Sequence, residues 1–169
     1  RLIDTMNDVL KECSDHRLVI AGRGSENDIL KLKEMIARST VRDRIEFIRH
    51  PAYERKLELF SRCSYVVIFS RYEGWCIVAI EAAAAGKAVL GTDIEGLRDS
   101  VENGYNGILI EEFDPDAAKR YAIQMCDQSF RFPYERNARA HATKFTWENI
   151  TDMQENVYKE ISTNHELKK

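Results

Sequence analysis

The sequence has few of the features that would place it in a membrane or in a disulfide-rich fold. Its longest apolar runs, residues 65–69 and 77–80, are far shorter than the roughly 18 residues of a membrane-spanning helix. The four cysteines are widely spaced and form no CxxC pair, which argues against a zinc cluster and against a disulfide framework. No signal-peptide pattern opens the chain. We therefore expect reduced thiols, no transmembrane segment and a cytoplasmic location, with peripheral association of the full-length protein with a membrane left open.

An excess of charge of one sign is also missing. Lys and Arg number 25 and Asp and Glu number 28, which gives a formal net charge of −3. Such a chain has no basic field for nucleic acid, so we expect no nucleic-acid partner. Its 169 residues suffice for one domain with a core, and the chain begins at Arg1 rather than Met. We treat residues 1–169 as one domain and expect it to be a piece of a longer protein, incomplete at its N-terminus.

Short apolar runs alternate with segments of helical period along the whole chain. We expect strands at residues 18–21, 44–48, 65–69, 88–90 and 107–110. We expect helices at residues 2–10, 29–36, 52–60, 77–85, 114–127, 134–144 and 147–161. This alternation is typical of an α/β fold with a doubly wound parallel sheet and helices on both faces.

The strand order of the sheet can also be predicted. In the doubly wound order 3-2-1-4-5-6, residues 18–21, 45–48 and 65–69 are strands 2, 3 and 4. The central strand 1 is then expected before Arg1. The continuously apolar run 65–69 is expected to be buried on both faces.

A loop and a helix start follow the strand 65–69 and combine carboxylates with backbone amides. If the helix begins at about Trp75, the N–H groups of Gly74, Trp75 and Cys76 point into the crevice beyond the strand, where a phosphate binds well. Glu73 precedes the helix and Glu81 lies eight residues later, about 12 Å along the axis if both are helical. Two such carboxylates can accept hydrogen bonds from hydroxyls at both ends of a sugar nucleotide. The alternative is that Glu73 complements the helix dipole and Glu81 has a structural partner.

Two other motifs carry less information. The loop 22–27, Gly-Arg-Gly-Ser-Glu-Asn, resembles half of a dinucleotide fingerprint, but Asn27 stands where the third glycine belongs. We favour a tight turn over a nicotinamide site. Asp114-Pro115-Asp116 has the spacing of an acidic metal-binding pair, but we assign it to the capping of a helix.

Residues 70–86 resemble the Glu-x7-Glu motif of the retaining family-4 glycosyltransferases. Further segments are similar in the same order along the chain, at residues 17–22, 61–67, 91–96, 101–109 and 145–147. The resemblance covers residues 17–161. It implies a Rossmann-like domain, the C-terminal donor-binding domain of a B-type glycosyltransferase fold.

The resemblance also implies roles for residues. Glu73 is expected to contact the hydroxyls of the donor sugar, as the catalytic residue, and Glu81 the ribose hydroxyls. The backbone of Gly74, Trp75, Cys76 and Ile77 is expected to face the diphosphate or the sugar. The donor is expected to be a UDP- or GDP-sugar, with no cofactor and no metal ion, because amides and basic side chains stabilise the leaving diphosphate. A sugar, lipid-linked or glycan acceptor would bind a separate N-terminal domain that this chain lacks, so the chain alone is expected to be inactive.

The sequence departs from this family at several positions. Cys76 and Ala88 stand where Gly and Pro are usual, and Glu95-Gly96 replaces a Gly-Gly pair. A sugar phosphorylase and a non-catalytic nucleotide-binding module remain alternatives, whereas the Glu-x7-Glu spacing argues against an epimerase.

Overall fold

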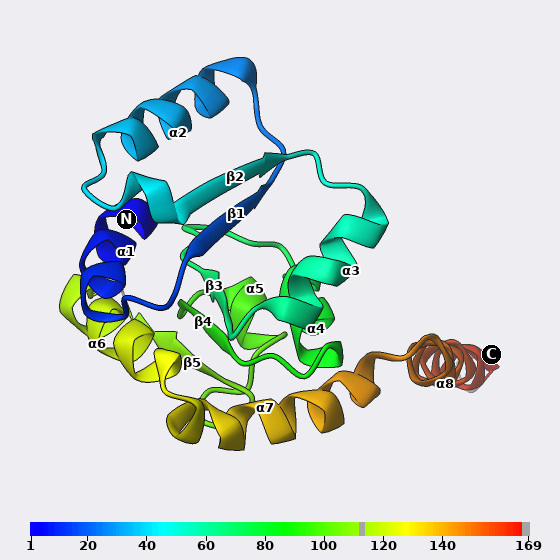
Figure 1. Ribbon diagram of the computed structural model, residues 1–169. Coiled ribbons are helices and arrows are strands. Elements are labelled where there is room, and N and C mark those ends of the chain that lie inside the picture. Colours follow the sequence, from blue (N-terminus) through cyan, green and yellow to red (C-terminus); the bar gives the residue numbers. More distant parts are fainter. Residues whose placement is uncertain (112–113, 167–169) are drawn as a thin grey trace.

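Strands and helices alternate along the computed structural model, which describes residues 1–111 and 114–166 (Figure 1). The strands within these ranges are β1 (Leu18–Gly22), β2 (Ile45–Arg49), β3 (Val66–Ile68), β4 (Val89–Thr92) and β5 (Gly107–Ile110). The α-helices are α1 (Leu2–Glu12), α2 (Glu26–Arg38), α3 (Tyr53–Arg62), α4 (Ile77–Ala84), α5 (Glu95–Arg98), α6 (Pro115–Cys126), α7 (Gln128–Ala142) and α8 (Trp147–Glu166). Short 3-10 turns, η1 (Arg42–Arg44) and η3 (Thr143–Phe145), precede β2 and α8.

The five strands form two parallel sheets. In one, β1 pairs with β2, with Leu18 opposite Ile45. In the other, β4 lies between β3 and β5, with Val89 opposite Val66 and Gly107. All five predicted strands are therefore present, and every pairing is parallel. β1 and β3 are not paired with each other, as the order 3-2-1-4-5-6 requires of its second and fourth strands; a strand between them stays a prediction.

Side chains on the two faces of β4 and β5 enter two different cores. Leu90, Ile108 and Ile110 pack with α1 and α6, in a cluster that also includes Leu18 of β1. Val89 and Leu109 point the other way, toward α4 and Leu97. The period-2 alternation of a strand thus brings helices to both faces of the sheet. This is the Rossmann-like α/β architecture predicted from the sequence.

The structure corrects three details. β3 is only partly buried, whereas β4 and β5 are buried throughout, so the run 65–69 is not covered on both faces. Helix α7 begins at Gln128 rather than at residue 134, because Asp127 caps its first turn by accepting from the Ser129 N–H, and Pro133 is accommodated inside the helix. The short helix α5 was not predicted.

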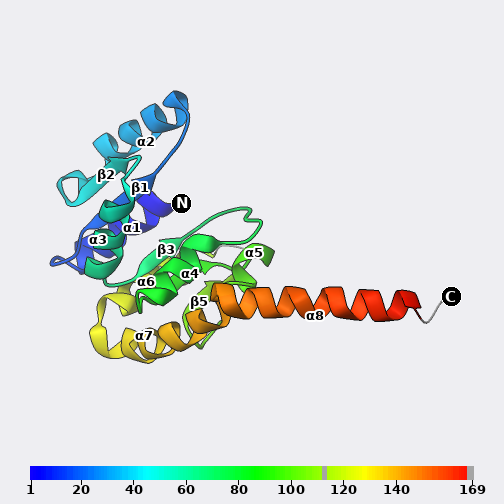
Figure 2. The ribbon, with the colours of Figure 1, turned by 90° about the vertical axis from the view of Figure 1, so that its right-hand side faces the viewer.

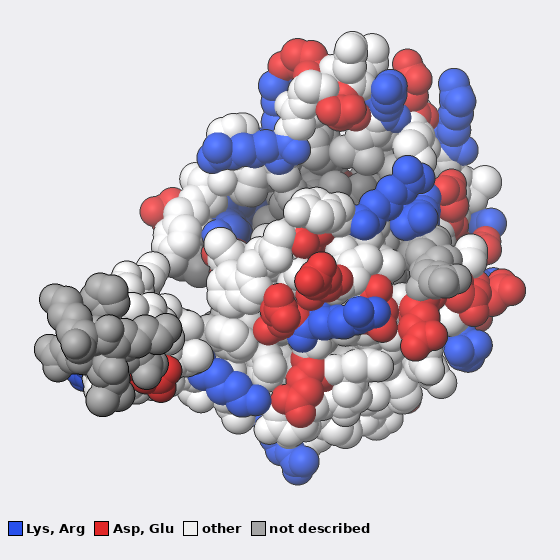
Figure 3. Space-filling model, turned by 180° about the vertical axis from the view of Figure 1, so that it is seen from behind, with Lys and Arg blue, Asp and Glu red and all other residues white. Residues whose placement is uncertain are grey.

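Helix α8 projects from the body of the domain (Figure 2). Its start was predicted correctly at Trp147, where the Thr146 hydroxyl accepts from the Asn149 N–H (3.3 Å). The space-filling view shows acidic and basic side chains interspersed over the face opposite to that of Figure 1, in keeping with the small net charge (Figure 3). Among the described residues, no helix is both long and apolar enough to cross a membrane.

Candidate functional site

The loop between β3 and α4 is held in place by the short helix α5, to which Gly96 belongs. The Ser70 hydroxyl donates to Glu73 Oε1 (2.7 Å), and the Cys76 N–H donates to the Gly96 carbonyl (3.2 Å). Gly96 lies directly against the backbone of this loop, since a Cβ atom at Gly96 would be 2.4 Å from the Glu73 carbonyl oxygen and 2.7 Å from that of Gly74. The structure therefore fixes Glu73 and Gly74 at the carboxyl end of β3 through close backbone packing.

Helix α4 begins at Ile77, as the predicted helix 77–85 has it, and not at about Trp75, the start that the argument about the free amides assumed. The Cys76 N–H donates to the Gly96 carbonyl, and the Ile77 N–H donates to the Trp75 carbonyl (3.0 Å). Within the part of the chain that the structure describes, the N–H groups of Gly74 and Trp75 have no hydrogen-bond acceptor. Of the three amides that were expected to be available to a phosphate, those of Gly74 and Trp75 therefore are, and that of Cys76 is not. Glu73 lies in the loop, so the helical spacing of about 12 Å does not apply to it.

Cys76 is a core residue. Its side chain is buried against Ala79 and Leu97. Burial raises the pKa of the Cys76 thiol, so the thiol stays protonated and unreactive at neutral pH. Ile77 and Val78, in contrast, are exposed on the first turn of α4.

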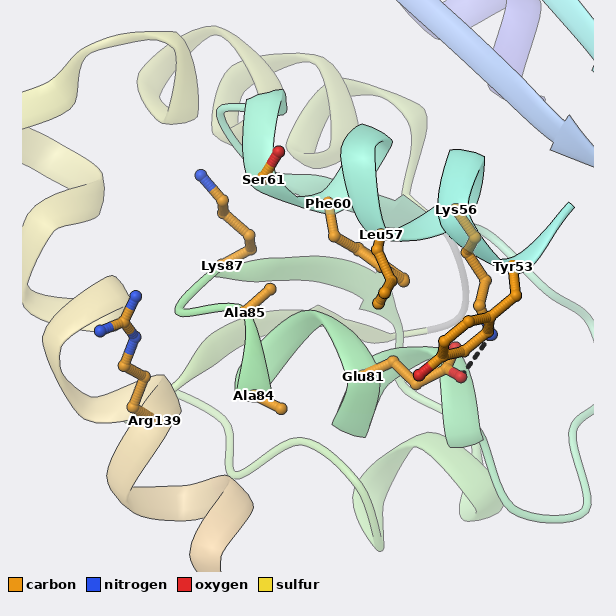
Figure 4. Close-up of a pocket in the computed structure, with 10 residues that line it drawn as sticks. All are labelled: Tyr53, Lys56, Leu57, Phe60, Ser61, Glu81, Ala84, Ala85, Lys87 and Arg139. Carbon is orange, nitrogen blue, oxygen red and sulfur yellow. Dashed lines mark hydrogen bonds and ion pairs between the residues drawn. The ribbon is translucent and has the colours of Figure 1, made fainter. Parts of the chain in front are cut away.

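Glu81 extends from α4 into a groove of about 540 Å³ between α3 and α4 (Figure 4). Lys56 of α3 donates to Glu81 Oε1 (2.5 Å), and the Glu81 side chain remains 31% exposed. Glu73 does not line this groove. The two carboxylates therefore do not share this groove: Glu73 lies in the loop before α4, and Glu81 lies in the second turn of α4.

Lys56 was not identified from the sequence. It is separated from Glu81 by 25 residues, and no motif links the two. The only signal in the sequence that these two residues could meet was the order of the elements, because α3 and α4 follow consecutive strands. With Glu81, Lys56 forms the ion pair that the structural alternative had required.

A row of ring contacts joins this loop to the C-terminal part of the domain. The Trp75 ring lies 5.5 Å from that of Phe145, which lies 5.4 Å from the imidazole of His141. His141 is 5% exposed, with Nε2 at 3.1 Å from the Ser100 carbonyl. Burial is the main cause that lowers the pKa of His141; the nearby Lys144 lowers it further, while the Ser100 contact and Glu102 oppose the shift.

We expect His141 to make the protein less stable in mild acid. Its folded-state pKa lies below the ordinary 6.5, so the unfolded chain binds the proton first. The free energy of unfolding then falls as the pH decreases below about 6.5, by up to about 1.4 kcal/mol per pH unit. Urea unfolding at pH 7, 6 and 5 should show a smaller loss for His141→Gln than for the wild type. Equal losses in the two proteins would show that another group is responsible.

The described side chains include no group of three or more His, Cys, Asp or Glu that could hold a metal ion. Asp114 accepts from the Asp116 N–H (2.9 Å) and caps α6, with Pro115 in its first turn. The helix-capping role predicted for this pair is confirmed.

Comparison with known proteins gives matches over most of the chain. Residues 1–145 match the family described as glycosyl transferases group 1. The chain is 29% identical to the uncharacterized glycosyltransferase MJ1178 of Methanocaldococcus jannaschii, covering 95% of this chain and 45% of that protein. It is 28% identical to the D-inositol 3-phosphate glycosyltransferase of Acidothermus cellulolyticus, covering 87% of this chain and 34% of that protein. The chain thus spans less than half the length of these relatives.

The fold is similar to that of solved structures. One is Anabaena Alr3699/HepE, crystallised in complex with UDP-glucose, with a TM-score of 0.76 at 20% identity. The match covers 96% of this chain and 44% of that protein. At this identity the likeness concerns the fold.

Proposed function

Because the chain belongs to the glycosyl transferases group 1 family, we propose that it binds the nucleotide-sugar donor of a retaining glycosyltransferase. The loop after β3 carries this proposal. It presents the Glu73 carboxylate and the Gly74 and Trp75 amides, and it leads into the helix that holds Glu81. In a parallel sheet, this carboxyl edge is where ligands bind.

The proposed roles follow from the chemistry of each group. The Gly74 and Trp75 N–H groups, at the positive end of α4, donate to the diphosphate as the sugar–phosphate bond breaks and negative charge moves onto the leaving group. Glu73 accepts hydrogen bonds from the sugar hydroxyls. Glu81, on the groove side of α4, accepts them from the ribose hydroxyls. Cys76 and Ile77 support the turn, because the Cys76 N–H already donates to Gly96 of α5 and the Ile77 N–H to Trp75.

A UDP-sugar is one donor that fits this proposal. Alr3699/HepE, which shares the fold, was crystallised with UDP-glucose. GDP-sugars remain the other candidate class. The acceptor and the transfer step belong to the whole protein, of which this chain would supply the donor site.

A crystal structure of the protein that carries this chain, solved with UDP or GDP, tests the proposal. We expect the β-phosphate within hydrogen-bond distance of the Gly74 and Trp75 amides. A nucleotide bound away from the carboxyl ends of the strands would refute it. We also propose that transfer needs no metal ion, so sugar transfer should persist in a chelator. Loss of transfer that a divalent ion restores would contradict this part.

A further inference from the structure

We propose that Lys56 is a positioning residue for the donor site, which fixes the Glu81 carboxylate and offsets its charge so that a nucleoside diphosphate can bind beside it. This inference rests on the proposed function, because it concerns the group assigned to the ribose.

The Lys56–Glu81 contact joins two helices across the groove. Lys56 Nζ lies 2.5 Å from Glu81 Oε1 and 5.4 Å from the centre of the Tyr53 ring, so the ammonium is held from two sides. Figure 4 shows the Lys56 and Glu81 side chains pointing toward each other, with Lys87 and Arg139 at the opposite end of the groove. Among the described residues, Lys56 is the only cation within ion-pair distance of Glu81.

The contact leaves Glu81 able to bind hydroxyls. A carboxylate has about four acceptor positions on its two oxygens, and the ammonium uses one position on Oε1. Oε2 remains for the ribose hydroxyls. Because the side chain is already held in one orientation, less conformational entropy is lost when the ligand binds.

The charge of Lys56 matters for a second reason. A bare carboxylate near a diphosphate would repel it, since like charges raise the free energy of the bound state. The ion pair removes most of this repulsion while keeping the carboxylate as a hydrogen-bond acceptor. A purely structural role is a weak alternative, because both side chains are about one-third exposed and such pairs contribute little to stability.

Ribose recognition provides the test. Affinities for UDP and 2′-deoxy-UDP, or for the GDP pair if guanine is preferred, are measured by calorimetry on the protein that carries this chain. We expect the wild type to prefer the ribonucleotide. Lys56→Met should lower the affinity for UDP about 10-fold. It should also bring the ratio of the affinities for UDP and 2′-deoxy-UDP close to one. Lys56→Arg should retain most of the ratio.

Two further variants separate positioning from general effects. Lys87→Met removes the same charge from the same groove and should leave the ratio unchanged. In a Glu81→Gln background, Lys56→Met should cause no further loss of the ratio, because the two residues act as one unit. Circular dichroism melting confirms that each variant is folded.

Different results would contradict the proposed donor site and the proposed role of Lys56. Equal losses of UDP and deoxy-UDP affinity in Lys56→Met would show that Lys56 acts through its charge alone and would overturn its positioning role. An unchanged ratio of the two affinities in this variant, while Glu81→Gln abolishes the preference, would overturn that role as well. An unchanged ratio in Glu81→Gln would show that Glu81 does not bind the ribose, and both proposals would fall.

Discussion

Gly96→Ala is expected to lower the free energy of unfolding by about 1–3 kcal/mol and to abolish binding of the nucleoside diphosphate. The added Cβ would lie 2.4 Å from the Glu73 carbonyl oxygen and 2.7 Å from its carbonyl carbon. These are backbone atoms that cannot rotate away, so the loop after β3 must move. That movement displaces the Glu73 carboxylate and the Gly74 amide together. Urea unfolding and calorimetric titration with UDP or GDP measure the two effects.

Gly74 supplies the matched control for stability. A Cβ at this position meets nothing within 4 Å, and its backbone does not have the left-handed conformation that requires glycine. The free energy of unfolding of Gly74→Ala should therefore lie within about 1 kcal/mol of the wild-type value. Gly74→Val should also fold but bind the nucleotide more weakly, because the branched side chain would occupy the space proposed for the phosphate. The packing argument fails if Gly96→Ala is as stable as Gly74→Ala.

Glu73→Ala and Glu81→Ala are expected to impair sugar transfer in different ways. Glu73 would contact the sugar, on which positive charge develops, so its loss should lower kcat by roughly 100-fold. Glu81 would hold the ribose, which does not change during the reaction. Its loss should therefore raise the KM for the donor by about 10- to 100-fold at nearly constant kcat, as expected for a charged hydrogen bond. Steady-state kinetics with varied donor separate the two.

Glu58→Ala provides the comparison for these variants. Glu58 pairs with Arg55 and Arg62 on α3, so the same change there removes a carboxylate without touching the site. Its kinetics should match those of the wild type. An unchanged donor KM in Glu81→Ala would show that the ribose assignment is wrong.

Local patterns predicted the elements of the fold well. Four strands were found from short apolar runs and β2 from the alternation of apolar and charged residues, and Asp114-Pro115 placed the start of α6 correctly. The errors have physical causes. Helix α7 begins at Gln128, ahead of the predicted residue 134, because Asp127 caps its first turn and Pro133 is accommodated inside the helix.

The candidate site could be predicted only in part. The Glu-x7-Glu spacing identified the right loop and helix. The amide argument assumed that α4 starts at about Trp75, and its start at Ile77 changes which amides remain available. The Lys56–Glu81 pair and the contact of Gly96 with the Glu73 backbone join residues that are distant in sequence. Such contacts depend on how the strands are ordered, which a local pattern does not contain.

The separation of β1 from β3 has a consequence for handling the protein. Among the described strands, each of these two has a single hydrogen-bonded neighbour, so each presents a row of backbone donors and acceptors on its other side. Such edges can recruit a strand from another molecule. We therefore expect chains prepared as residues 1–169 to self-associate as their concentration rises, which sedimentation over a concentration series would reveal. Ligand affinities of the isolated chain are best measured at low protein concentration, where strand edges of different molecules do not pair.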